Sequence, residues 1–213
     1  ESFELLAGQP AKADLFEGID LSWARFPGTG EVGARLQEAR RVFRPDRPAA
    51  SLPALLKARS ALQALPVALQ AEPLIQAKAA ELEDLLRAAA GLWVEAIADR
   101  QRLAPGDRLT VHAAVLARGG SPLVLESLSL EAVTPEGSRA LETRPDGQPL
   151  PDNAPRKAAF TFTVPAATPL GQPHWLGGPG GIAWAGLPES PAPFRLRARV
   201  ALPEGSFEAV VPV

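Results

Sequence analysis

Apolar residues recur at helical spacing in the first half of the chain. The spacing predicts three helices, at about 29–44, 51–65 and 73–91, each bounded by prolines or by a glycine. Thr29 is expected to cap the first of them. The apolar stripe of that helix has residues three or four positions apart: Val32, Leu36, Ala39 and Phe43. Three helices joined by short links indicate a small bundle or a single helical layer.

From about residue 93 the period of the pattern changes to two. Apolar and polar positions alternate along short segments that proline and glycine turns separate. The strands expected from this pattern are 93–98, 109–115, 158–164, 194–200 and 207–213. A further strand over 123–130 changes phase midway, which predicts a β-bulge. The pattern therefore predicts an α+β protein in which an antiparallel, Ig-like β-sandwich follows the helices.

The change of period divides the chain into two expected domains. Residues 1–95 are predicted to form a helical connector domain, and residues 96–213 a β-sandwich domain. The sequence begins Glu1-Ser2-Phe3, without an initiator methionine, and its last segment is expected to be a strand that runs to Val213. We therefore expect a processed or excised piece of a longer polypeptide.

Composition narrows the classes of function. Of the 213 residues, 46% are hydrophobic and 22% are charged, and the formal net charge is −2. This charge gives no general attraction to nucleic acid, and no apolar run approaches the roughly 18 residues that a membrane span needs. Because cysteine is absent, disulfides and thiolate metal sites are excluded. The compartment stays open, with export to the periplasm or the cell exterior as one expectation.

Residues 28–33 have the glycine spacing G-x-G-x-x-G of a dinucleotide-binding loop. Such a loop follows a strand, opens a helix and leads to a parallel strand, with an acidic residue about 20 positions on. Asp46 has about that spacing, but it lies in a proline-rich loop, and further helices follow where a strand is needed. We therefore expect these glycines to shape a turn and a helix start, and to bind no cofactor.

The sequence contains no recognisable catalytic or metal-binding combination. His112 and His174 are the only histidines, and neither belongs to an H-E-x-x-H or H-x-x-E-H pair. No serine lies in a G-x-S-x-G elbow. The acidic residues within 81–84 are expected on a solvated helix face, at pairing distance from Lys78 and Arg87. We therefore expect no catalytic residue, no metal ligand and no cofactor in this chain.

The long segment between Pro165 and Pro193 is the first candidate ligand or partner surface. Segments of this length without regular structure are uncommon in compact domains unless they are functional or disordered. This one contains three aromatic side chains: His174, Trp175 and Trp184. The indoles could stack on a sugar ring or enter a partner's groove. The alternative is that they hold the segment against the sandwich or the helices.

The second candidate surface is a row of arginines on one strand. Arg195, Arg197 and Arg199 alternate with apolar residues, so they are expected to project from one face. Such a row could bind acidic or sugar partners. The alternative is the solvent face of a half-buried strand, with charges that protect a sheet edge against pairing.

Five phrases stand along the chain in a distinctive order. The longest is D-L-F-E-G-I-D-L-S-W-A-R-F-P-G, residues 14–28, and the shorter ones are 51–56, 90–92, 104–107 and 172–176. In content and order they resemble long bacterial deacetylases of the LmbE/PIG-L type, in which a segment like the longest phrase follows the catalytic domain. Two positions depart from the family pattern. His174 stands where an aromatic residue is expected, and Ala117-Arg118 stands where Asn-Arg is usual.

The resemblance implies a function for a larger protein. Members of the family are metal-dependent amidohydrolases that hold zinc with a His-Pro-Asp-Asp-type motif and a further histidine. No such motif is present here, so no catalytic or zinc residue carries over. The resemblance therefore implies the non-catalytic C-terminal region of a deacetylase that acts on an N-acetylated sugar or a related conjugate, with the preceding hydrolase domain as its partner.

Three hypotheses follow. The leading one is an accessory region that supports or positions a hydrolase domain or its substrate. The second is an independent carbohydrate- or protein-binding sandwich module, which requires Trp175 or Trp184 to be exposed. The third is a self-contained enzyme, which metal analysis and amidase or esterase assays of the purified chain would reveal.

Overall fold

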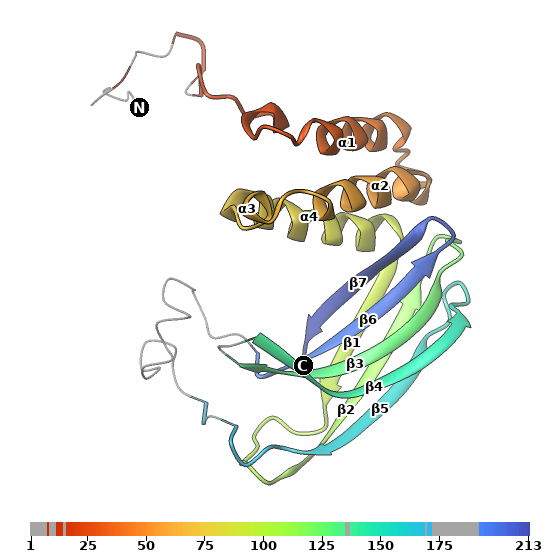
Figure 1. Ribbon diagram of the computed structural model, residues 1–213. Helices are drawn as coiled ribbons and strands as arrows, with labels where there is room; N and C mark the ends of the chain where they lie inside the picture. Colours follow the sequence, from red (N-terminus) through yellow and green to blue (C-terminus); the bar gives the residue numbers. More distant parts are fainter. Residues whose placement is uncertain (1–7, 9–11, 15, 135–136, 169, 172–191) are drawn as a thin grey trace.

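The computed structural model describes residues 8, 12–14, 16–134, 137–168, 170–171 and 192–213. Within these residues, a layer of helices lies on one side of two β-sheets (Figure 1). The helices come first along the chain and the strands follow, as the change of hydrophobic period predicts.

The three predicted helices are confirmed. Among the described residues the helical elements are η1 (Trp23–Arg25), α1 (Gly30–Val42), η2 (Pro48–Ser51), α2 (Leu52–Gln63), α3 (Val67–Gln70) and α4 (Pro73–Ala89). Proline lies in the first turn of both α2 and α4, where its missing N–H costs no hydrogen bond. The four-residue helix α3, which lies between two prolines, was not predicted.

Thr29 precedes α1 as expected, but its side chain does not cap that helix. The buried hydroxyl donates instead to the carbonyl of Phe26 at 2.8 Å and to the carbonyl of Trp23. Gly28 has a φ of +90°, and a Cβ on Gly33 would lie 3.2 Å from the Cβ of Trp23. The glycine-rich segment thus makes a turn and lets the Trp23 turn pack on α1, which agrees with the sequence interpretation.

The second half forms two antiparallel sheets. The described strands are β1 (Leu92–Ala98), β2 (Arg108–Ala117), β3 (Val124–Thr134), β4 (Gly137–Pro149), β5 (Arg156–Thr163), β6 (Phe194–Leu202) and β7 (Gly205–Pro212). One sheet has the order β1-β2-β5 and the other β4-β3-β6-β7. The predicted bulge is confirmed, because the register of β3 shifts between Leu125 and Ser127 against both of its neighbours.

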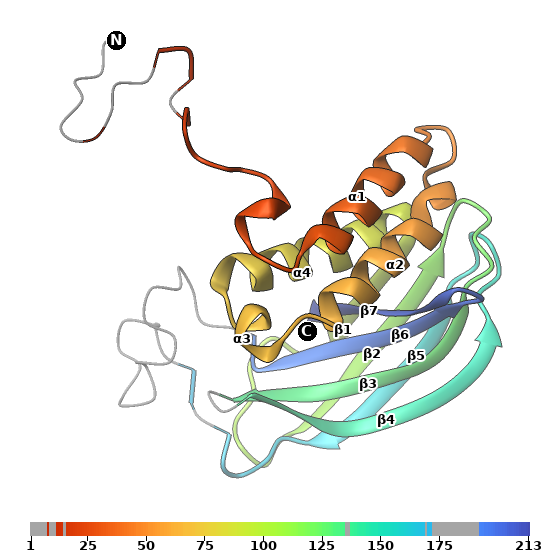
Figure 2. The same ribbon diagram turned by 45° about the horizontal axis from the view of Figure 1, so that its top comes forward.

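Helix α4 covers one open side of the two-sheet assembly. The terminal strands β1 and β7 contact each other, and α4 contacts both of them (Figures 1 and 2). Leu82 and Leu86 of α4 are buried in the same apolar cluster as Phe160 of β5 and Phe207 of β7. The helices therefore share a continuous hydrophobic core with the sheets and shield strand edges that would otherwise be free to pair.

A glycine fixes the junction between α4 and the first strand. Gly91 has a φ of +61°, and a Cβ on it would lie 1.9 Å from the carbonyl oxygen of Arg118. The Arg118 N–H donates to the Gly91 carbonyl at 2.9 Å, which ties the start of β1 to the end of β2. β1 begins at Leu92, so the sheets start slightly before the predicted domain boundary at residue 95. The division into two domains stays a prediction.

Candidate binding groove between helix α2 and the last hairpin

The three predicted arginines lie on β6, which the structure places inside its sheet. β6 pairs with β3 on one side and with β7 on the other. The interpretation that Arg195, Arg197 and Arg199 protect a sheet edge is therefore wrong. Their side chains instead extend across the outer face of the sheet to glutamates on both neighbouring strands.

Glu131 of β3 is the centre of this ionic row. One of its oxygens accepts from Nε of Arg195 and the other from Nε of Arg197, each at 2.6 Å. Burial raises the pKa of Glu131, but the hydrogen bonds and positive charges of Arg197 and Arg195 outweigh it and lower the pKa to about 2. Arg197 also donates to Glu208 of β7, and these carboxylates raise its own pKa against the opposing effect of burial.

Arg199 continues the row toward the helices. Its Nε donates to Glu126 at 2.6 Å, and its Nη2 donates to the Ser206 hydroxyl at 3.1 Å. Its Nη1 lies 3.8 Å from a Glu208 oxygen. The row therefore contains equal numbers of arginines and glutamates, so its charges balance.

A polar groove lies at the helical end of this row. Helix α2 forms one wall and the β6–β7 hairpin the other, and the hollow between them has a volume of about 530 Å³. It is lined by Leu56, Arg59, Ser60, Gln63, Arg199, Glu204, Gly205, Ser206 and Glu208. Of the predicted surface residues that the structure describes, Arg199 is the one that lines this groove.

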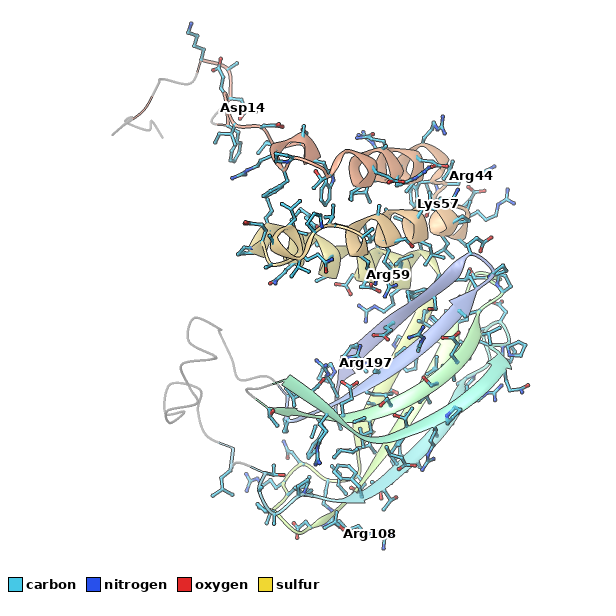
Figure 3. The ribbon with its side chains drawn as sticks, in the orientation of Figure 1. Asp14, Arg44, Lys57, Arg59, Arg108 and Arg197 are labelled. Carbon is cyan, nitrogen blue, oxygen red and sulfur yellow. The ribbon has the colours of Figure 1, made fainter. Side chains whose placement is uncertain are left out.

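Arg59 joins the two walls. Its Nη1 donates to the carbonyl of Ser206 at 3.2 Å and lies 3.5 Å from the side-chain oxygen of Gln63. Its Nε donates to Glu83 of α4. Figure 3 shows Arg59 between the helical layer and the sheets. The carbonyl of Ser206 thus accepts a hydrogen bond from Arg59, and its hydroxyl accepts one from Arg199. Ser206 therefore holds two guanidinium groups from opposite walls of the groove in position.

A second hollow continues the groove over α2 toward α1. Its volume is about 380 Å³, and it shares Leu56, Ser60 and Glu204 with the first. It adds the ion pair between Glu31 and Arg35, whose charged atoms lie 3.5 Å apart. The remaining lining residues are Lys57, Ala61 and Ala64. The two hollows form one extended groove over α2.

Two histidines and two tryptophans were also singled out in the sequence. His174, Trp175 and Trp184 lie outside the described residues, so their role stays a prediction. His112 is exposed on β2, on the face opposite buried Leu109 and Val111, as the alternation predicts. Within the described ranges, no group of three or more histidine, aspartate or glutamate side chains is placed to hold a metal ion.

The predicted pairs around the acidic segment of α4 are confirmed. Lys78 lies 2.8 Å from Glu81, and Arg87 lies 3.2 Å from Asp84. Glu83, which was expected on the same solvated face, turns toward Arg59 instead, and one of its oxygens is buried without a hydrogen-bond partner among the described residues. None of the helices in the part of the chain described here combines the length and the apolar character that crossing a membrane requires.

Comparison with known proteins identifies no family for this chain. No protein-family model matches this sequence, and no curated protein matches it. Among solved structures, sporulation control protein Spo0M from Bacillus subtilis has 14% identity and a TM-score of 0.31, with 58% of this chain and 49% of Spo0M covered. The chain thus matches about half the length of Spo0M.

Two further solved structures show the same level of similarity. The Pseudomonas fluorescens alkylpurine DNA glycosylase AlkC, bound to DNA with an abasic site analog, has 12% identity, a TM-score of 0.30 and coverage of 78% of this chain and 47% of AlkC. The β-glucosidase EmGH1 from Erythrobacter marinus has 11% identity, a TM-score of 0.29 and coverage of 58% and 15%. TM-scores this low carry no argument about fold or function.

Proposed function

We propose that this chain is the non-catalytic accessory region of a zinc-dependent deacetylase of the LmbE/PIG-L type, and that it packs against the hydrolase domain of that protein. The observation that carries the proposal is the described segment before η1, which extends away from the helices (Figure 2). Several of its apolar side chains are exposed. We call the described residues of this segment, 12–14 and 16–22, the N-terminal arm.

The arm holds its shape through its own hydrogen bonds. The Glu17 carboxylate accepts from the backbone N–H of Lys12 at 2.5 Å, and Asp14 accepts from the N–H of Phe16 at 2.9 Å. Asp20 accepts from the hydroxyl and the N–H of Ser22, and these two bonds lower the pKa of Asp20 below its usual value. Local side-chain bonds of this kind define a turn without help from packing.

The same arm presents three large apolar side chains to solvent. Phe16 is 57% exposed, Ile19 52% and Leu21 71%. Apolar side chains gathered in one short segment are typical of an interaction site, because their burial against a partner is favourable by about 25 cal/mol per Å². The arm overlaps residues 14–28, the longest phrase that resembles the deacetylases, which supports a hydrolase domain as the partner.

The strand order supports an Ig-like assignment as part of this proposal. If β1, β2, β3, β5, β6 and β7 are equated with strands A, B, C, E, F and G of an Ig-like sandwich, the two sheets become A-B-E and C-F-G, with β4 as an added strand beside C. A sandwich of this type presents its loops and faces to other domains, which suits an accessory role.

The reading frame upstream of the codon for Glu1 tests the proposal directly. We expect it to encode a hydrolase domain with a His-Pro-Asp-Asp-type zinc motif. An upstream region of another class would contradict the proposal.

Hydrogen exchange then tests the docking of the arm in the full polypeptide. We expect the amides of the arm to exchange more slowly in the full polypeptide than in the 213-residue chain, and the double variant Phe16→Ser, Leu21→Ser to lose that protection. The matched control is Val67→Ser on α3, which removes an 82% exposed apolar side chain away from the arm. Equal exchange in the two proteins would contradict the docking.

A further inference from the structure

The groove over α2 has a lining that restricts the chemistry of its ligand. Hydroxyl, amide, guanidinium and carboxylate groups dominate the first hollow, whereas the second, which includes Leu56, Ala61 and Ala64, exposes polar and apolar surface in similar amounts. Sites for drug-like apolar ligands are lined predominantly by hydrophobic and aromatic side chains. A polar ligand that forms many hydrogen bonds is therefore the better match.

Cations and carboxylates are mixed along the groove, and Glu204 belongs to both hollows. The first contains Arg59 and Arg199 against Glu204 and Glu208, and the second contains Arg35 and Lys57 against Glu31 and Glu204. With Glu204 counted once, four cations and three carboxylates line the whole groove, and Arg59 and Arg199 are also paired with Glu83 and Glu126. An anion would therefore meet these carboxylates, and a cation would meet the guanidinium groups. A ligand without net charge avoids both repulsions.

The polar groups are also held in position before any ligand arrives. Arg59 is fixed by Glu83 and Ser206, and Arg199 is fixed by Glu126 and Ser206. The walls are a helix and a β-hairpin of regular structure. Fixed donors and acceptors reduce the entropy lost on binding, so they favour specific recognition.

From this polar lining, its mixed charges and its rigidity we infer that the groove is a binding site for an uncharged oligosaccharide. Each sugar hydroxyl both donates and accepts, so it can bond to carboxylates and to guanidinium, amide or hydroxyl groups at once. The two hollows, about 530 Å³ and 380 Å³, each have the size of a small-molecule site and share a border, which accommodates linked sugar units. Peptides are bound through free strand edges, apolar grooves or clusters of a single charge sign, whereas this lining mixes cations with carboxylates.

Nuclear magnetic resonance titration of the isotopically labelled 213-residue chain tests the inference. The probes are the neutral disaccharides cellobiose, maltose, mannobiose and chitobiose, compared with inorganic phosphate and a neutral Gly-Ser peptide. We expect at least one disaccharide to produce saturable shifts at the amides of residues 56–63 and 204–208, with little dependence on salt. Phosphate and the peptide are expected to produce none there.

Two variants and a matched control locate the site. Ser206→Ala and Gln63→Ala each remove one side-chain hydrogen-bonding group from the groove, and each is expected to weaken binding about three- to tenfold. Ser138→Ala is the control, because its hydroxyl also accepts from a β6 arginine, Arg195, but it lies outside the groove. It is expected to leave the affinity unchanged.

Several outcomes would overturn the inference. They are no saturable shift with any disaccharide, shifts that map elsewhere, binding of phosphate or of the peptide at these amides, and equal weakening by Ser138→Ala. The inference does not depend on the proposed function, since the arm variants do not change the groove. Failure in the titration and failure of the arm to dock are therefore separate results.

Discussion

The two sheets present different outer faces. On the sheet β4-β3-β6-β7, arginines of β6 are linked to glutamates of β3 and β7 in a continuous ionic row. On the sheet β1-β2-β5, the exposed residues include Trp93 and Ile97 of β1, His112 of β2 and Ala159 of β5. Ile97, His112 and Ala159 lie side by side across the three strands.

The difference shows that alternation along a strand and chemistry across a sheet are separate properties. Both sheets direct most of their apolar residues inward with the same period of two. The interactions on the outer face depend on side chains of the neighbouring strands. Glu131 pairs with Arg197, 66 residues later in the sequence, and Glu126 pairs with Arg199, 73 residues later. One outer face is cross-linked by ion pairs, whereas among the described residues no ion pair joins two strands of the other sheet, and Thr110 and Thr161 hydrogen-bond across β2 and β5 at 3.2 Å.

The largest effect is expected from removal of Glu131. Glu131→Ala leaves Arg195 without its carboxylate partner and Arg197 with only Glu208, so we expect the free energy of unfolding to fall by about 3 kcal/mol. Urea denaturation measures it. The control is Glu142→Ala on β4, whose pair with Arg144 is solvent-exposed and should contribute less than about 1 kcal/mol. Equal losses in the two variants would remove the distinction between the central and the peripheral ion pairs.

Acid should lower the free energy of unfolding through the ionic row, by somewhat less than Glu131→Ala does. The pKa of Glu131 is lowered from 4.5 to about 2 in the folded protein. A lowered folded-state pKa stabilises the fold above the unfolded-state value, and this stabilisation is lost as the pH falls from 4.5 to about 2. The loss is at most on the order of 3 kcal/mol, reduced by solvent screening of the partly exposed arginines. Stability measured against pH should show this slope in the unmodified chain and a shallower one in Glu131→Gln.

The smallest effect is expected on the outer face of the β1-β2-β5 sheet. Trp93 is 43% exposed on β1, so Trp93→Ala should lower the free energy of unfolding by about 1 kcal/mol or less. The matched inward change, Leu109→Ala on the adjacent β2, removes a side chain that is 1% exposed and should cost about 3 kcal/mol. Thermal unfolding of both variants measures the difference. A large loss for Trp93→Ala would mean that this face also carries structural interactions.

Periodicity was sufficient to predict the elements with strong apolar patterns. It located α1, α2, α4, the inward-facing strands and the bulge in β3. It missed β4, because the stretch Gly137–Pro149 has mostly exposed side chains and contains Pro145, Asp146 and Gly147. Its strand conformation depends on pairing with β3, which is non-local information.

The groove could not be predicted for the same reason. Arg59 and Ser206 are 147 residues apart and meet only because the helical layer packs on the last hairpin. In the sequence, Arg59 is one of several charges on an amphipathic helix, and Ser206 is an ordinary hairpin residue. The arginine alternation on β6 did indicate an outward-facing row, but the pattern of one strand contains nothing about the glutamates that neutralise it.

The position of α4 over β1 and β7 decides how this protein can be divided. A truncated chain that starts at Leu92 would retain every strand but would uncover the edges of β1 and β7 and the apolar surface beneath Leu82 and Leu86. Such a fragment would be prone to self-association through those edges. The smallest portable unit of this protein therefore includes its helices, and a fusion or transplant should begin upstream of Trp23.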